Sequence, residues 1–566
     1  MSEACDVLVV SDFNAELVSR YVSADRSLPK CSAASAPYGQ VFQVLSNSAT
    51  PDPNRVALIW TRPEGVIPEF ANLLAGQKAS ARRLDDGVDG FAEMIKKFAE
   101  DCRYVFVASW VPTYHDRGMG LLNWSNDGAA YHLARMNTRL AEALAEVADV
   151  FMLDSQRWIE SSDNPRDRKS WLLAKSPFTE KVFKAAAGDV KSALRTAMGM
   201  NRKLVLVDLD NTMWGGVVGD DGWENLRLGG HDHLGEAFSE FQQALMTLVK
   251  RGIAVGIVSK NDEAVALEAI TKHPEMVIRV GDLAGWRINW KDKAQNIVEL
   301  VGELNLGLQS TVFIDDSPAE RGRIREALPD VLVPDWPADP SKYAEALQQL
   351  DCFDRSSITS EDRGRTRMYV ADRERRDSLT VASSIGDWLA SLDVRVRANP
   401  VSPENLKRIV QLMNKTNQMN MRTRRTSEKE LLQWLDGGNG RNLLSVTVSD
   451  RFGDLGLTGV VSWEQAGTAI EIVDYILSCR AMGRQVEQLM VHLVVQAASR
   501  AQCDTVIARF FPTAKNRPCL EFWEGSGFAS TEPNVFVWKT ADDFPKPDFI
   551  TLEGKFGPVE QMTPAI

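Results

Sequence analysis

The feature that most constrains this chain is a run of four apolar residues, Leu204–Val207, followed directly by the sequence Asp208-Leu209-Asp210-Asn211-Thr212. A short apolar run bounded by polar turn residues is typical of a strand buried in a parallel sheet. Similar runs alternate with segments of helical spacing further along the chain, which predicts a doubly wound α/β domain. The other predicted strands of this domain are Ala254–Val258, Val277–Val280, Val312–Ile314 and Val331–Val333.

The acidic motif after the first of these strands indicates phosphoryl chemistry. In a parallel sheet, ligands bind outside the carboxyl ends of the strands, which is where this motif lies. Two carboxylates two residues apart can share one metal ion and still play different roles. We expect Asp208 to attack phosphorus and form an aspartyl-phosphate. We expect Asp210 to protonate the leaving oxygen and then to activate water, with Thr212 binding the phosphate.

Four further residues complete a candidate site. Ser259 directly follows a predicted strand and is placed to donate a hydrogen bond to a phosphoryl oxygen. Lys293 is expected to stabilise phosphate charge in the transition state, although Lys291 is a rival for this role. The strand Val312–Ile314 ends in Asp315-Asp316. The predicted metal ligands are therefore Asp208, Asp210, Asp315 and Asp316, and carboxylates with several waters favour Mg²⁺.

The segment after the nucleophile, MWGGVVGDDGWENLRLGG, is short and rich in glycine. It offers no room for a large lid domain over the predicted site. We therefore expect an open site that admits a bulky or protein-borne substrate.

The whole chain of 566 residues is longer than one ordinary domain. Its patterns predict an α/β multidomain protein with an N-terminal α/β layer domain, a central Rossmann-like domain, a charged helical connector, a C-terminal α+β domain and a tail. The predicted bounds of these parts are 1–195, 196–350, 351–385, 386–545 and 546–566.

Composition narrows the classes of function. The net charge of −12 argues against general nucleic-acid binding. The sequence has no apolar run of about 18 residues, so we expect no membrane span, and the start MSEACDVLVV lacks the pattern of a signal peptide. Seven scattered cysteines without a CxxC pair indicate free thiols in a reducing compartment. We expect a cytoplasmic protein.

The N-terminal region contains four apolar runs that predict strands and one amphipathic helix, Asn137–Val147. Ser11-Asp12 and Ser109 each follow such a run, as the nucleophile of a serine esterase would. However, the region has no Gly-x-Ser-x-Gly elbow, and DSQRW stands where an Asp-x-x-His pair is expected. We therefore expect a degenerate, SGNH-hydrolase-like domain. The predicted strands are Val7–Val10, Val56–Trp60, Tyr104–Ser109 and Val150–Leu153.

The C-terminal region carries a second candidate site. Cys479 and Arg480 lie between a predicted strand and an amphipathic helix, and Gly483 lies just before that helix. Backbone N–H groups left free there would bind an anion. This layout, with FWEGSGF at Phe522–Phe528, resembles the GCN5-related acyltransferase (GNAT) fold, although the usual glycine-dense loop is reduced to RAMGRQ. Cys479 is either an activated thiol or a buried apolar residue.

Taken together, the motifs resemble the FkbH-like proteins, which are haloacid dehalogenase-superfamily enzymes found with polyketide biosynthesis. The resemblance spans about residues 55–530. It implies that 1,3-bisphosphoglycerate is dephosphorylated and that its glyceryl unit is loaded onto an acyl carrier protein bearing phosphopantetheine. The chain departs from the family at SDFN, near the first strand, and at Gln485. The segments that carry the resemblance are VDLDNTMWGGVVGDDG, FIDDSPAER, NKTNQMN, DYILSCRAMGR and PTAKN.

The resemblance assigns the phosphatase roles to Asp208, Asp210, Thr212, Ser259, Lys293, Asp315 and Asp316. It also matches a Ser-Cys-Arg motif at Cys479 and Arg480, and a Thr-Asn-Gln motif at Asn417. Cys479 would hold the acyl group, with Arg480 and Asn417 in substrate binding. The alternatives are a simple phosphomonoesterase and a non-catalytic carrier-docking module. We further expect the arginine-rich stretches 363–376 and 422–425 to form a basic face for an acidic carrier protein.

Overall fold

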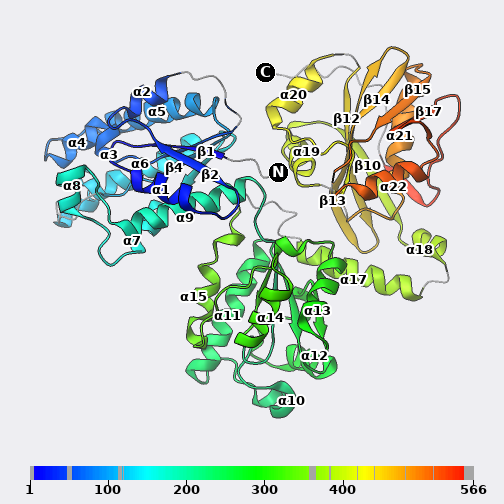
Figure 1. The fold of residues 1–566 in the computed structure, drawn as a ribbon, viewed down its shortest axis with the longest axis horizontal. Helices are drawn as coiled ribbons and strands as arrows, with labels where there is room; N and C mark the ends of the chain where they lie inside the picture. Colours follow the sequence, from blue (N-terminus) through cyan, green and yellow to red (C-terminus); the bar gives the residue numbers. More distant parts are fainter. Residues whose placement is uncertain are drawn as a thin grey trace. The chain divides into compact units, whose positions relative to one another are not determined.

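The computed structural model describes residues 5–47, 52, 54–112, 118, 120–355, 365–381, 384–416, 418–438, 440–478, 480–513 and 515–553. The chain divides into two compact units. One unit contains residues 1–202 and 348–358, and the other contains residues 203–347 and 359–566. Figure 1 shows the elements of each unit. Within the described residues, no helix combines the length and the apolar character that crossing a bilayer requires.

The first unit is built on a five-stranded sheet in the order β2-β1-β3-β4-β5. All neighbouring strands are parallel. The four strands predicted for this region are present, and the structure adds the edge strand β2, whose sequence CSAAS lacks large apolar residues. The strands are β1 Cys5–Val10, β2 Cys31–Ser35, β3 Arg55–Ile59, β4 Tyr104–Ala108 and β5 Val150–Leu153.

Helices cover both faces of this sheet, because alternate residues of the buried strands point to opposite sides. Val56 and Leu58 of β3 join the core under α1 and α9, whereas Ala57 and Ile59 join the core under α5 and α6. The predicted helix Asn137–Val147 lies within and just beyond the C-terminal part of α6. The helices are α1 Glu16–Ala24, α2 Val41–Ser46, α3 Pro63–Val66, α4 Pro68–Leu74, α5 Ala81–Ala99, α6 Ala129–Leu144, α7 Ser155–Glu160, α8 Arg168–Ala174 and α9 Glu180–Ala197, with 3₁₀ turns η1 Gly120–Trp124 and η6 Asp351–Phe353.

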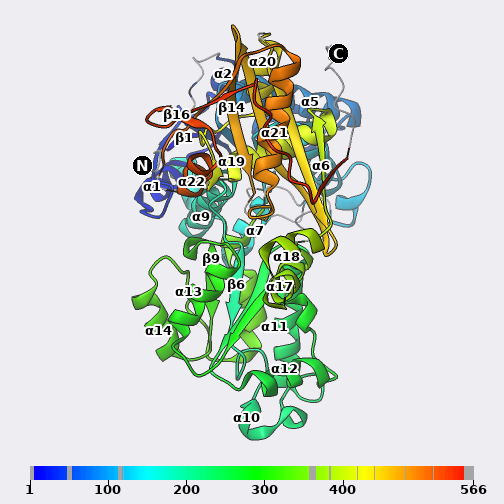
Figure 2. The ribbon, with the colours of Figure 1, turned by 90° about the vertical axis from the view of Figure 1, so that its right-hand side faces the viewer.

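The second unit contains a four-stranded parallel sheet in the order β8-β7-β6-β9. Figure 2 shows β6 and β9 between helices α13 and α14 on one side and helix α11 on the other. This sheet positions the candidate site. Its elements are β6 Leu204–Val207, α10 Val218–Asp221, η2 Trp223–Asn225, α11 His233–Lys250, β7 Ala254–Ser259, α12 Glu263–Lys272, η3 Val280–Asp282, β8 Gly285–Ile288, α13 Lys293–Glu303, η4 Leu308–Ser310, β9 Thr311–Ile314, α14 Pro318–Ala327, η5 Pro340–Lys342 and α15 Tyr343–Gln348.

Two of the strand predictions for this sheet, Val277–Val280 and Val331–Val333, are wrong. The backbone N–H groups of Val277 and Ile278 donate to Oε1 of the buried Gln242, so this segment is satisfied by a side chain instead of a neighbouring strand. The fourth strand is instead β8, a few residues later. The segment 331–333 contributes only an isolated bridge from Leu332 to Val312.

A larger mixed sheet forms the C-terminal part of the second unit. Its strands follow the order β16-β17-β15-β14-β13-β12-β10-β18, and the short β11 pairs with β14. The apolar runs Leu444–Val448, Thr458–Trp463 and Ala469–Leu477 predict strands, and they lie within β12, β13 and β14. The elements are α18 Ile385–Ser391, β10 Val394–Pro400, α19 Pro403–Lys415, β11 Met419–Asn420, α20 Glu428–Asp436, β12 Asn442–Asp450, β13 Gly453–Ala466, β14 Ala469–Leu477, α21 Val486–Arg500, β15 Thr505–Arg509, α22 Arg517–Gly525, β16 Ala529–Glu532, β17 Val535–Lys539 and β18 Ile550–Glu553.

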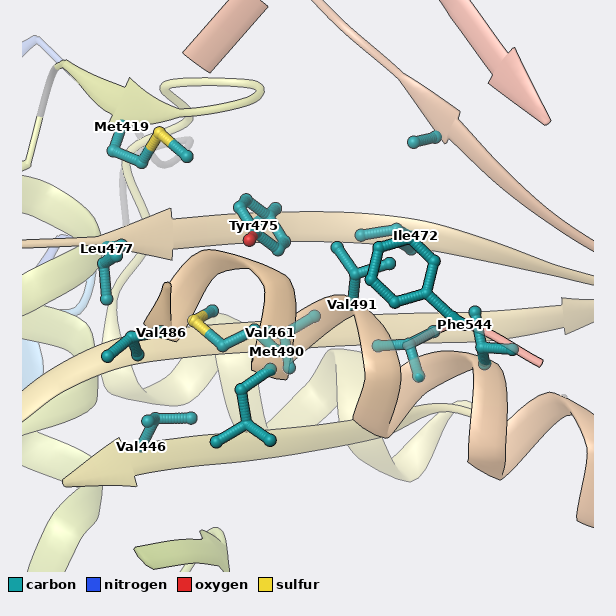
Figure 3. Close-up of a cluster of buried hydrophobic side chains, with 14 of the residues drawn as sticks. Met419, Val446, Val461, Ile472, Tyr475, Leu477, Val486, Met490, Val491 and Phe544 are labelled. Carbon is teal, nitrogen blue, oxygen red and sulfur yellow. The ribbon is translucent and has the colours of Figure 1, made fainter. Parts of the chain in front are cut away.

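Helix α21 lies across one face of this sheet and closes its main core. Figure 3 shows Val486, Met490 and Val491 of α21 pointing toward Val461 and Tyr475 on the strands. Helices α19 and α20 supply apolar residues to a second cluster on the other face. The sheet is therefore buried on both sides.

The helix predicted for the connector is present, whereas part of the predicted tail differs. The connector contains helix α17, Arg365–Val381, whose Arg375 forms a buried ion pair with Asp450 of β12. Residues 550–553 were assigned to the tail, but they form β18 and pair in parallel with β10.

Candidate active site

The candidate catalytic residues meet because parallel strands end at one edge of the four-stranded sheet. Val207 of β6 is in register with Ile314 of β9 and with Ile257 of β7. Asp208 therefore follows its strand beside Asp315, and its backbone N–H donates to the carbonyl of Ile314 at 3.0 Å. Ser259 ends β7 and Lys293 begins α13.

Lys293 lies between two of the carboxylates. Its Nζ is 3.0 Å from Oδ1 of Asp208 and 2.6 Å from Oδ2 of Asp315. Burial acts to lower the pKa of Lys293, but the two carboxylates outweigh this effect and raise it. Lys293 is therefore a buried, charged ammonium in the candidate site. Lys291 is exposed, so the structure favours Lys293 of the two rivals.

Asp208 is buried, and burial raises the pKa of its carboxyl group in spite of the Lys293 charge and hydrogen bonds from Lys293 and Ser259. Ser259 is buried as well and contacts the candidate nucleophile directly.

Three carboxylates form a candidate cation site. Within the described residues, Asp208, Asp315 and Asp316 each present an oxygen within 4.8 Å of the others. Oδ1 of Asp208 is buried, and the ammonium of Lys293 lies 3.0 Å from it. A single ammonium cannot neutralise three carboxylates, and buried charge that is not compensated is costly. The residues therefore fit a hard divalent cation, which takes oxygen ligands.

Asp210 is placed apart from this group, although the sequence predicted it as a fourth metal ligand. Its Oδ1 accepts hydrogen bonds from Nε1 of Trp214 at 2.9 Å and from the backbone N–H of Val218 at 3.1 Å. Its Oδ2 accepts one from Nδ2 of Asn261 at 2.8 Å. Burial raises the pKa of Asp210 and these three donors lower it, with a net upward shift. This setting suits proton transfer better than metal binding by the carboxylate.

Thr212 holds the loops of the site together. Its side chain is fully buried and accepts a hydrogen bond from the backbone N–H of Asp316 at 3.1 Å. It also donates to Oδ1 of Asp316 at 3.3 Å. Arg321 of α14 donates to the carbonyl groups of Asp315 and Asp316, both at 2.7 Å. Thr212 thus orients a candidate metal ligand, a contact that the predicted phosphate-binding role did not include.

The mouth of the site carries only a small cap. Between β6 and α11 the chain forms the one-turn helix α10 and the 3₁₀ turn η2. Trp290 and Lys291 are exposed on the loop that leads to Lys293. This agrees with the expectation of a site without a large lid domain.

The second candidate site is only partly visible. Cys479 and Asn417 lie outside the described residues. Arg480 donates to Oγ of Ser478 at 3.4 Å and contacts Sδ of Met368 on α17 at 2.8 Å. The backbone N–H of Gly483, which we expected to be free for an anion, donates to Oε1 of Glu487 at 2.9 Å. That expectation is wrong, because a buried glutamate already satisfies the group.

The expectation of a basic face at residues 422–425 is also wrong in part. Arg422 pairs with Glu471 at 2.8 Å. Arg424 forms two hydrogen bonds to the buried Asp474, at 3.0 and 2.9 Å. These guanidinium groups are compensated inside the domain and do not form a free positive surface. Arg363 and the side chain of Arg376, from the other stretch, lie outside what the structure describes.

In the first unit, the residues that suggested an esterase make structural contacts. Oγ of Ser11 accepts a hydrogen bond from the N–H of Phe13 at 3.2 Å. Asp12 is buried and accepts hydrogen bonds from the backbone N–H and from Nε of Arg62, both at 2.8 Å. Oγ of Ser109 lies 3.1 Å from Oγ of Ser155. These contacts give no support to a serine nucleophile at these positions.

Comparison with solved structures identifies a likeness that extends over more than half of the chain. The chain is similar to the N-terminal part of the protein BF1531 from Bacteroides fragilis, described as containing a phosphatase domain complexed with Mg. The two are 26% identical, with a TM-score of 0.56, over 62% of this chain and 95% of the other. No family model matches the chain, and no curated protein matches it.

Two weaker likenesses are to acetyltransferases. The likeness to a putative phosphinothricin N-acetyltransferase covers 24% of this chain and 85% of that protein's chain, with 19% identity and a TM-score of 0.20. The likeness to a putative GNAT-family acetyltransferase from Desulfovibrio desulfuricans covers 26% of this chain and 99% of that protein's chain, with 11% identity and a TM-score of 0.21. At TM-scores this low, the likeness establishes no shared fold.

Sequence reasoning missed Trp214 and Asn261, the two side chains that hold Asp210. Asn261 comes two residues after Ser259, so its position just beyond a predicted strand end was a usable signal. The sequence around Trp214 contains no such signal, since a tryptophan in a glycine-rich turn predicts no particular contact.

Proposed function

We propose that this chain is a Mg²⁺-dependent phosphatase with Asp208 as its covalent nucleophile. The observation that carries the proposal is the convergence of Asp208, Asp315 and Asp316, with the buried Lys293 paired to the first two. The likeness to the BF1531 phosphatase domain complexed with Mg supports the same chemistry. The likeness covers 95% of that N-terminal part of BF1531.

The residues suit a two-step displacement. In the first step a carboxylate oxygen of Asp208 bonds to phosphorus while the bond from phosphorus to the leaving oxygen breaks. Asp210 gives its proton to that oxygen, so an alcohol leaves. In the second step water attacks phosphorus, Asp210 takes a proton from the water, and the bond to Asp208 breaks. The products are inorganic phosphate and the original enzyme.

The remaining groups stabilise charge. Lys293 faces the nucleophile and would neutralise the phosphoryl oxygens as charge shifts in the transition state. Ser259 contacts Asp208 and is placed to orient it. Asp208, Asp315 and Asp316 would hold the cation, which supplies further charge neutralisation when it is bound.

The finer proposal concerns the substrate. The small cap fits a bulky or protein-borne phosphate, and the sequence resembles enzymes that load a glyceryl unit onto an acyl carrier protein. We propose that the 3-phosphate of 1,3-bisphosphoglycerate is removed at Asp208. The acyl phosphate would be attacked at carbonyl carbon by the Cys479 thiolate, which forms a thioester and releases phosphate. The carrier thiol would then displace the Cys479 sulfur from the acyl group.

Two other functions are distinguishable from this one. A simple phosphomonoesterase would release phosphate without any acylated carrier, and a carrier-docking module would do neither. The buried, charged Lys293 beside Asp208 argues against a docking module, since binding alone does not require it.

The deciding experiment incubates the protein with 1,3-bisphosphoglycerate, Mg²⁺ and phosphopantetheinylated carrier proteins, and weighs the intact carriers by mass spectrometry. The proposal predicts a carrier that gains one glyceryl group together with release of phosphate. Phosphate release with an unchanged carrier would contradict acyl transfer and would indicate a simple phosphomonoesterase.

A further inference from the structure

The three hydrogen bonds to Asp210 distinguish its two oxygens. Oδ1 accepts from Trp214 and from the backbone of Val218, which uses both of its lone pairs. Among the described residues, Oδ2 accepts from Asn261 alone. One lone pair of Oδ2 therefore stays available for a proton or a substrate oxygen.

Asn261 is itself fixed in one orientation. Its Oδ1 accepts the backbone N–H of Asp262 at 3.1 Å, so its Nδ2 faces Asp210. The side chain is 4% exposed and lies in the loop after β7, next to the loop that carries Asp210. A buried amide with both ends engaged has little freedom to rotate. It can therefore set the direction in which Oδ2 presents its remaining lone pair.

We propose that Asn261 is a positioning residue that orients Oδ2 of Asp210 as the proton-transferring atom, an inference that rests on the proposed phosphatase function. In the first step Oδ2 carries the proton and delivers it to the leaving oxygen, which becomes the alcohol. The donor N–H of Asn261 keeps the resulting carboxylate in place, so that Oδ2 accepts the proton from water in the second step.

This role predicts a dependence on the leaving group. A nitrophenolate leaves without help from an acid, whereas an alkoxide needs a proton as its bond breaks. Loss of Asn261 should therefore damage the hydrolysis of alkyl phosphates far more than that of 4-nitrophenyl phosphate. The ratio kcat/KM reports the steps up to alcohol release and isolates this effect from the later hydrolysis of the aspartyl-phosphate.

The experiment compares wild type, Asn261→Ala and Trp214→Phe with 3-phosphoglycerate and 4-nitrophenyl phosphate in the presence of Mg²⁺. We expect Asn261→Ala to lower kcat/KM about 100-fold for the alkyl phosphate and only a few-fold for the aryl phosphate. Trp214→Phe should act in the same direction but less, because Oδ1 keeps the Val218 donor. Asn261→Leu, which keeps the volume of the side chain and removes its N–H donor to Oδ2, provides the test if Asn261→Ala does not fold.

Asn289→Ala is the matched control for general damage. Asn289 lies in the next loop of the same sheet edge and exchanges hydrogen bonds with the buried Asn296, at 2.9 and 3.3 Å. Any loss in this variant should fall equally on both substrates. An equal loss on both substrates in Asn261→Ala and Trp214→Phe would overturn the positioning role while the phosphatase function stood. A wild-type protein inactive toward both substrates would overturn both proposals.

Discussion

The ammonium group of Lys293 and the carboxylate of Asp208 form a buried ion pair, with Nζ 3.0 Å from Oδ1. The same ammonium lies 2.6 Å from Asp315, so one cation holds two carboxylates from neighbouring strands. The pKa of Lys293 is raised by these neighbours, which keeps the group charged where phosphate would bind.

Replacement of this lysine should abolish most of the activity. Lys293→Met keeps the length of the side chain and removes its charge, and we expect kcat/KM for phosphate release to fall at least about 100-fold. Circular dichroism would confirm that the fold persists. Lys291→Met is the control, because Lys291 is exposed two residues away. A larger loss in Lys291→Met than in Lys293→Met would reverse the assignment of the lysine role.

Removal of the metal should stop phosphate release. Three carboxylates converge on one point, and Lys293 compensates only part of their charge. Dialysis against a chelator should abolish activity, and added Mg²⁺ should restore it. Activity that survives exhaustive chelation would remove the metal from the account.

Arg424 is predicted to stabilise the C-terminal domain instead of binding a partner. Asp474 is 1% exposed and also accepts a hydrogen bond from Ser462 at 2.7 Å. Arg424→Ala would leave this buried carboxylate without its cation and should lower the free energy of unfolding by about 2–4 kcal/mol. Thermal or urea unfolding would measure the change.

A suitable comparison is Arg517→Ala, whose partner Glu521 lies on the same helix at the surface. This variant should show little measurable change, as exposed pairs contribute little to stability. If Arg424→Ala is as stable as Arg517→Ala and loses carrier loading, the docking role should be reinstated.

The Cys479 thiol is proposed to carry the acyl group. Cys479→Ala should lose carrier loading yet retain removal of the 3-phosphate at Asp208, because the two chemistries use different nucleophiles. Brief exposure of wild type to 1,3-bisphosphoglycerate without carrier should leave a protein adduct that hydroxylamine removes.

Other cysteines serve as internal controls for this adduct. Burial raises the pKa of Cys102 to about 11 and the pKa values of Cys352 and Cys519 to about 12, so little thiolate is available at these positions. The adduct should therefore map to the peptide that contains Cys479. Normal carrier loading by Cys479→Ala would mean that the carrier thiol attacks the acyl phosphate directly.

The parts of the site that sequence could predict are those fixed by local position. Asp208, Ser259 and Asp315 each follow an apolar strand, and parallel strands gather such residues at one edge. The strand β8 was missed because GWRI is not a continuous apolar run, and 277–280 was mistaken for it. In segment 277–280, Ile278 is buried, but the backbone N–H groups of Val277 and Ile278 donate to the Gln242 side chain, a contact that no local pattern encodes.

Contacts between distant segments were the hardest to predict. The arginines at 422 and 424 stood out in the sequence as a positive cluster, but their partners lie about 50 residues away on β14. The hydrogen bond from Asn261 to Asp210 likewise joins two loops that are 51 residues apart in the sequence. Such contacts can be predicted only when the register of the strands in the folded sheet is known.

The most direct test of the central claim is to trap the aspartyl-phosphate. The protein is mixed with Mg²⁺ and a phosphorylated substrate, quenched in acid, digested and analysed by mass spectrometry. The account predicts one added phosphoryl group on the peptide that contains Asp208 in wild type. It predicts none in Asp208→Asn, which should also lose phosphate release while it keeps its fold. Phosphate release by Asp208→Asn at near wild-type rate, or a phosphoryl group on a different residue, would contradict the account.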